Sequence, residues 1–221
     1  MDELKKETFR LEPSIIVLII ANLIPVYGVV FLGWNVLDIL LVFWVENLAI
    51  GLFTILKMLT VGLIAGGIFR LIGTLFRICF FCAHYGLFTL GHGVLIYAIF
   101  GDGPFTKGAI KAEYWPSLYE PFLPGHALFY AALSILGSHL FSYVYNFIIR
   151  KEYASSKVDI LMFRPYGRVV ILHIVILLGG FLAEKSGSSI AALLLLVVIK
   201  ICIDIVLHRQ IHKPIKTTVS L

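Results

Sequence analysis

Residues 77–100 read RICFFCAHYGLFTLGHGVLIYAIF, and this stretch decides the fold. The segment is long and apolar enough to cross a bilayer as a helix, yet it carries two imidazoles, His84 and His92. At 1.5 Å per residue the two rings lie about 12 Å apart along a helix axis, so both can face one bundle interior at two depths. A polar side chain in hydrocarbon needs a partner or a water-filled cavity, so the segment predicts a polar site inside a membrane bundle.

The composition agrees with a membrane protein. The chain has 221 residues, of which 60% are hydrophobic and 14% charged, and its mean hydropathy is +0.97. A soluble domain of this length cannot bury so much apolar surface, so we expect an all-α, multi-pass bundle in the cell membrane with the lipid bilayer as its partner. The net charge of +5 comes from basic residues between the apolar runs, which form no patch for nucleic acid. A homo-oligomer is compatible with this composition.

Six apolar segments are long enough to span the membrane: 14–33, 37–57, 77–100, 126–149, 168–184 and 187–208. Fourteen lysines and arginines fall at the two ends of the chain and in the connections after the second and fourth spans, against three in the opposite loops. Because cytoplasmic loops carry the excess of basic residues, both termini are predicted to be cytoplasmic. The expected organisation is a cytoplasmic segment 1–13, one six-helix membrane domain 14–212 and a cytoplasmic tail 213–221.

Two connections and a cysteine pair allow more than one interpretation. Residues 58–69 are apolar and glycine-containing but too short to cross, so an interfacial or re-entrant piece is expected. The loop 101–125 holds prolines and aromatic rings that favour a cap on the outer surface, with a substrate-admitting lid as the alternative. Cys79 and Cys82 form a CxxC inside a predicted span and are expected to be small packing residues, with metal or redox use as the alternative.

The second predicted span carries a carboxyl group, Glu46, followed by Asn47. An acidic side chain at the centre of a membrane helix costs about 2.5–3.5 kcal/mol, so Glu46 needs a partner. Counted from the outer ends of their spans, Glu46 and His92 lie at similar depths. We therefore predict that they pair, with Glu46 either protonated, orienting the imidazole, or sharing a metal with it.

Polar residues from four predicted helices lie at similar depths in the cytoplasmic half: His84, His139, His173, Asp204 and His208. Neutral imidazoles with a carboxylate suit zinc or iron, so these residues predict a divalent-metal site near the cytoplasmic leaflet. Helix contacts without a function would instead use serine, threonine and glycine. Five further polar side chains are expected to support these sites: Asn47, Ser142, Asn146, Lys200 and His212.

The last predicted span ends in a polar stripe at every fourth position: Lys200, Asp204, His208 and His212. Steps of four residues turn by only about 40°, so ligands from successive turns can reach one cation, as in the HxxxH of zinc helices. In the alternative interpretation Lys200 and Asp204 neutralise each other, and the two histidines meet the cytoplasmic interface.

Five runs of this sequence resemble a prokaryotic membrane family known as domain of unknown function 6498. They are WVENLAIGLFTILKM (44–58), AHYGLFTLGHG (83–93), GSHLFSYVYNFIIRKEY (137–153), MFRPYGRVVILHIVILLGGF (162–181) and KICIDIVLHRQIHK (200–213). The resemblance implies that a set of polar residues belongs to the family pattern: Glu46, His84, His92, His139, His173, Lys200, Asp204 and His208. The family pattern does not include the cysteines, and the resemblance implies no particular activity.

Four functions are compatible with these residues. The first is a metal-centred membrane protein, with an open metal position that could activate water or oxygen as an enzyme does. The second is a proton-coupled small transporter or channel that uses the same groups as a relay. Haem ligation by histidines and a purely structural role rank below both. Whether the protein is an enzyme stays open, as do its substrate and the identity of any metal.

Overall fold

The computed structural model describes residues 23–64, 67–101, 116–186, 194 and 197–199. These residues form helices and turns and contain no strand. Several predictions fall outside the described residues: the terminal segments 1–13 and 213–221, almost all of the sixth span, and the stripe residues Lys200, Asp204, His208 and His212.

Four helices in the described part are long and apolar enough to cross a membrane: Val36–Ile64, Ile68–Phe100, Ala127–Ile149 and Val158–Gly179. The first two are α2 (Val36–Ile64) and α3 (Ile68–Phe100). The third joins α5 (Ala127–Ser142) to the π-helix η3 (Tyr143–Ile149). The fourth joins α6 (Val158–Phe163) to α7, which spans Tyr166–Ser186. The all-helical fold is therefore confirmed with four candidate spans, while the predicted first span is described only from residue 23.

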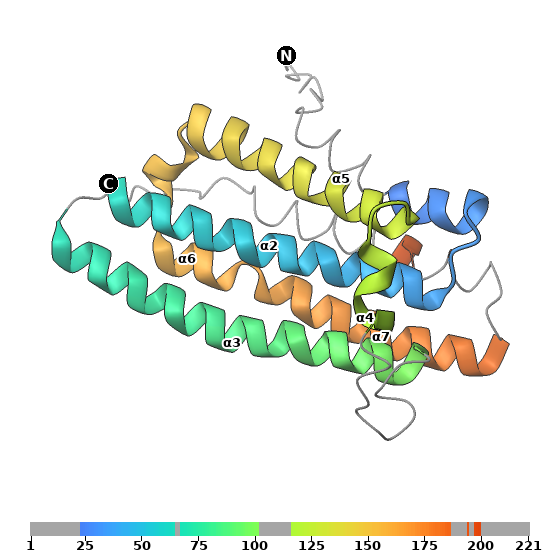
Figure 1. Ribbon diagram of the computed structural model, residues 1–221. Coiled ribbons are helices and arrows are strands. Elements are labelled where there is room, and N and C mark those ends of the chain that lie inside the picture. The colour runs from blue at the N-terminus through green and yellow to red at the C-terminus, as the bar shows by residue number, and fades with distance from the viewer. Residues whose placement is uncertain (1–22, 65–66, 102–115, 187–193, 195–196, 200–221) are drawn as a thin grey trace, which may run out of the picture.

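Helix α2 is the centre of the described bundle, with α5 on one side and α3 and α7 on the other (Figure 1). In its most apolar window 56% of the residues are buried, against 17% for α3. A helix that is apolar on every side belongs inside a bundle, and the sequence of α2 has this character. One hydrophobic cluster packs Leu40 of α2 against Ile96 of α3 and Ile176 of α7, and a second packs Met58 of α2 against Phe81 and Phe147.

The stretch 58–69, expected as an interfacial or re-entrant piece, is helical over most of its described residues. Helix α2 continues to Ile64, and α3 begins at Ile68 after Gly67, whose φ of 84° lies in the left-handed region. The stretch contains no proline, and its apolar side chains continue the helical pattern, so both helices extend into it. Apart from residues 65–66, which lie outside the described chain, the stretch therefore belongs to the two long helices and their boundary at Gly67.

The prediction for the cysteine pair is also modified. Cys79 and Cys82 are both exposed on α3, so they do not act as packing residues within the described bundle.

The described end of the 101–125 loop forms two short elements, α4 (Pro116–Tyr119) and the 3-10 helix η2 (Glu120–Phe122). A third short element, the 3-10 helix η4 (Glu152–Ser155), precedes α6.

Candidate functional site

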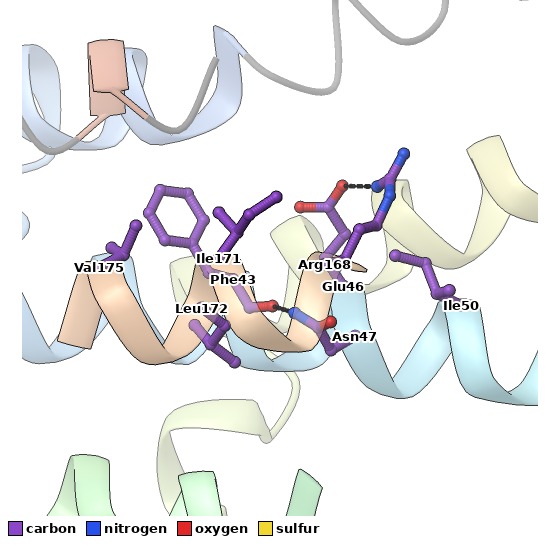
Figure 2. Close-up of a pocket in the computed structure, with 8 residues that line it drawn as sticks. All are labelled: Phe43, Glu46, Asn47, Ile50, Arg168, Ile171, Leu172 and Val175. Carbon is purple, nitrogen blue, oxygen red and sulfur yellow. Dashed lines mark hydrogen bonds and ion pairs between the residues drawn. The ribbon is translucent and has the colours of Figure 1, made fainter. Parts of the chain in front are cut away.

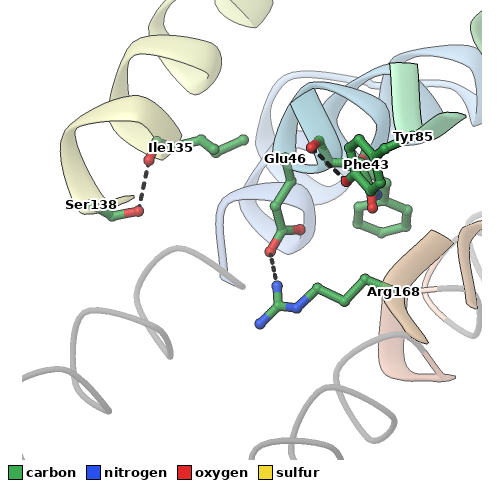
Figure 3. A network of polar contacts seen from close by, with 7 residues as sticks. Phe43, Glu46, Tyr85, Ile135, Ser138 and Arg168 are labelled. Atoms are coloured by element: carbon green, nitrogen blue, oxygen red, sulfur yellow. Dashed lines mark hydrogen bonds and ion pairs between the residues drawn. The ribbon is translucent and has the colours of Figure 1, made fainter. Parts of the chain in front are cut away.

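An ion pair joins α2 to α7 in the interior of the bundle. Arg168 Nη1 donates to Glu46 Oε1 at 3.1 Å, and the two side chains are only 26% and 13% exposed (Figure 3). The predicted Glu46–His92 pair is therefore wrong, since His92 makes its contacts elsewhere. Arg168 had been placed at the cytoplasmic end of a span, but α6 precedes α7 within one candidate span. This extension places Arg168 well inside the helical segment.

The residue beside Glu46 connects α2 to α3. Asn47 is buried, and its Nδ2 donates to the carbonyl of Phe43 at 2.9 Å. Its own backbone carbonyl accepts a 2.8 Å hydrogen bond from the hydroxyl of Tyr85 on α3. Gly51 permits this approach, because a Cβ there would lie 2.7 Å from the Tyr85 ring. A glycine on α2 therefore brings an α3 hydroxyl to the polar site.

Replacing Tyr85 by phenylalanine is expected to reduce the free energy of unfolding by about 1 kcal/mol. The ring stays in its buried place against Gly51, and the hydrogen bond to the Asn47 carbonyl is lost. Equilibrium unfolding of the purified protein in mixed detergent micelles measures the change. Tyr130→Phe is the matched control, because Tyr130 is exposed on α5; equal effects of the two substitutions would contradict the role given to Tyr85.

A small pocket lies between α2 and α7 around the ion pair (Figure 2). The centre of a water-sized molecule has about 20 Å³ available in it. Its walls come from matching positions of the two helices: Phe43, Glu46, Asn47 and Ile50 of α2, and Arg168, Ile171, Leu172 and Val175 of α7. Both sets follow the spacing i, i+3, i+4, i+7, which marks one face of a helix. The polar groups stand at the centre of the pocket and apolar side chains flank them.

A pair of imidazoles joins α3 to α7 further along. His92 Nε2 lies 3.2 Å from His173 Nδ1, and the two rings stand nearly perpendicular, at 84°. His92 is buried, and its Nδ1 lies 2.7 Å from the carbonyl oxygen of Phe88. His173 is exposed in the described part of the bundle. The sequence had placed these two histidines in different clusters, and the structure brings them together.

The other two described histidines of the predicted metal set have separate partners. His84 Nδ1 lies 3.0 Å from the hydroxyl of Tyr166, and its ring stacks on Phe80. The ring of His139 packs against Phe53, with centroids 5.9 Å apart. Among the residues that the structure describes, no three His, Cys, Asp or Glu side chains come together to hold a metal ion. The predicted metal cluster gains no support from these residues, and Asp204 and His208 lie outside them.

The supporting residues on the fourth span contact each other. Asn146 Nδ2 donates to Ser142 Oγ at 3.3 Å. Asn146 lies in the π-helix η3 and is buried. This pair lies on the α5–η3 segment, whereas the ion pair joins α2 to α7.

The sequence did not predict several of the polar partners that join α2, α3 and α7. The partners that were missed are Tyr85, Tyr166 and Arg168. A further one is Trp44 on α2, whose Nε1 donates to the carbonyl of Thr89 on α3 at 2.7 Å. A signal was present for Tyr85, because it precedes His92 by seven residues and so shares its helix face. We use the name polar core for the following residues: Glu46, Asn47, Tyr85, His92, Arg168 and His173.

A helical fold with four segments apolar enough to cross a bilayer, and with ionisable groups at their contacts, indicates an integral membrane protein. The chain belongs to a family of unknown function (DUF6498), whose model matches residues 4–220. The resemblance noted in the sequence is thus confirmed over nearly the whole chain. No curated protein and no solved structure matches it.

Proposed function

We propose that this protein moves protons through the cell membrane along its polar core, as a proton-coupled small transporter or channel. The contact between His92 and His173 carries the proposal, because it joins two helices that are apolar enough to cross a bilayer. Imidazole is the side chain whose charge ordinarily changes between about pH 5 and 8. Ionisable groups inside membrane segments commonly mark the path of an ion or a proton.

The hydrogen-bond geometry allows a proton to pass between the two rings. The Phe88 carbonyl can only accept, so His92 Nδ1 carries a hydrogen. In the neutral pair His92 Nε2 therefore accepts, and His173 Nδ1 donates to it. When a proton binds Nε2 of His173, the Nδ1 proton can transfer to Nε2 of His92. The positive charge then rests on the buried ring, and the His173 ring is again neutral. For the proton to travel on, the Nδ1 hydrogen of His92 must leave the Phe88 carbonyl for another acceptor.

The remaining polar groups extend along the same helices. In the orientation that the basic residues favour, with six spans and both termini cytoplasmic, α3 begins at the cytoplasmic side. The His84–Tyr166 contact is then nearer the cytoplasm, and the His92–His173 contact is nearer the outside. Glu46 lies beside this path. Arg168 does not release its proton in proteins, so its role is to hold the charge of Glu46.

Substitution of His92 by alanine is expected to reduce the initial rate of proton uptake by at least about tenfold, since a positioned proton-transfer group commonly contributes 10²–10⁴-fold. The measurement uses purified protein in liposomes that enclose a pH-sensitive dye, with a potassium diffusion potential as the driving force. His126→Ala is the matched control, because His126 is exposed at the start of α5 and makes no side-chain capping bond.

Two outcomes would overturn the proposal. One is wild-type uptake no faster than that of protein-free liposomes, and the other is an unchanged rate in His92→Ala. Elemental analysis of the same preparations tests the metal-centred alternative. Zinc or iron at one ion per chain, lost in His84→Ala, would favour the metal-dependent enzyme expected from the sequence.

A further inference from the structure

The pocket between α2 and α7 contains a buried acceptor without a donor. Asn47 is 6% exposed and lines this pocket (Figure 2). Its Nδ2 is bound to the Phe43 carbonyl, but within the described chain its Oδ1 has no hydrogen-bond partner. The large majority of buried side-chain polar atoms in proteins have a partner, and a missing one is costly. The pocket therefore favours a ligand that donates a hydrogen bond.

From this geometry we infer that the pocket is a binding site for one water molecule, held by Asn47 and the Glu46–Arg168 pair. A buried water needs roughly 10–15 Å³ for its centre and two to four polar partners. The pocket offers about 20 Å³, which is room for one molecule and not for a chain of them. The water donates to Asn47 Oδ1, and Glu46 and Arg168 are the other polar residues that line the pocket.

Charge decides between water and a small cation such as ammonium. Glu46 and Arg168 are paired at 3.1 Å and neutralise each other. A bound ammonium would add an uncompensated positive charge in a largely apolar environment, which costs far more than a neutral donor does. Water satisfies the amide oxygen without this cost. It also gives Glu46 a neighbour for proton exchange, and this last role alone rests on the proposed function.

Hydroxyl-radical footprinting by X-ray radiolysis tests the site, because a bound water that is split in place labels the side chains beside it. The wild-type protein carries its own control. Phe43 is 2% exposed and lines the pocket, whereas Phe81 is 1% exposed and does not line it. We expect labelling of Phe43 at least several-fold above that of Phe81, read by mass spectrometry. Equal labelling of the two rings would overturn the inference without any variant.

Two substitutions test whether Asn47 holds the water molecule. Asn47→Leu removes the acceptor and is expected to lower Phe43 labelling to the level of Phe81. Asn146→Leu is the matched control, because Asn146 is also buried, and its Oδ1 also has no partner among the described residues, but it does not line this pocket. Unchanged Phe43 labelling in Asn47→Leu would contradict the assignment. A fall in wild-type labelling on titration with ammonium chloride would replace water by ammonium as the ligand. None of these results depends on proton transport.

Discussion

Replacing Arg168 by methionine is expected to lower the free energy of unfolding by about 3 kcal/mol. The substitution leaves the Glu46 carboxylate in the bundle interior without the cation that contacts it at 3.1 Å. Breaking a buried pair from one side costs about 3–5 kcal/mol, and the partial exposure of Arg168 favours the lower end of this range. The insertion cost of an acidic side chain, about 2.5–3.5 kcal/mol, leads to the same figure. Unfolding in mixed detergent micelles, followed by tryptophan fluorescence, measures the change.

A second ion pair of the chain provides the control. Arg77 and Asp159 approach more closely, at 2.6 Å, but their side chains are 43% and 64% exposed. Exposed pairs contribute little, so Arg77→Met is expected to cost less than about 1 kcal/mol. The double variant Glu46→Gln with Arg168→Met removes both interior charges and should recover most of the lost stability. Equal losses in Arg168→Met and Arg77→Met would show that burial does not set the energy of the interior pair.

Introducing a methyl group at Gly93 is expected to destabilise the α2–α3 contact by about 1–3 kcal/mol, the usual cost of overpacking. A Cβ at this buried position would lie 2.9 Å from two carbons of the Trp44 ring. The same ring donates its Nε1 hydrogen to the Thr89 carbonyl at 2.7 Å, so it cannot move away without weakening this bond. The free energy of unfolding of Gly93→Ala tests the argument.

Gly91 is the matched position, two residues earlier on the same helix. A Cβ there meets nothing within 4 Å in the described chain. Gly91→Ala is therefore expected to leave the stability unchanged or to raise it by up to about 1 kcal/mol, because alanine favours the helix over glycine. Effects of the same sign and size at the two positions would contradict the close approach of Trp44 to α3.

Much of the helical framework could be predicted from the apolar runs. The predicted spans 37–57, 77–100, 126–149 and 168–184 all overlap helices of the structure. This agreement has a physical cause, since backbone groups in hydrocarbon must bond within their own segment and an uninterrupted apolar run therefore forms a helix. The residues at which the helices begin and end were predicted less well. Helix α2 passes its expected end, and α6 begins inside an expected loop, because a charged residue does not by itself stop a helix.

The candidate site could be predicted only in part. The ionisable residues in the apolar runs identified Glu46, His92 and His173 as important, but their partners were assigned by depth. Depth gives the height of a residue along a helix and not the side of the helix on which it lies, and each residue turns by about 100°. His92 therefore meets His173 rather than Glu46. Arg168 stood at the first position of the predicted span 168–184, at its cytoplasmic end, and so was not considered as a partner.

The amino-acid sequence by itself determined the helical class of this protein and which polar residues lie within its apolar segments. Both follow from local composition, because burial of apolar length and satisfaction of the backbone depend on each segment alone. Only the tertiary structure decided that Glu46 pairs with Arg168 and His92 with His173, since these contacts join residues 122 and 81 positions apart. Such contacts depend on the rotation and register of whole helices. Packing between glycines and rings, as at Gly51 with Tyr85, contributes to both.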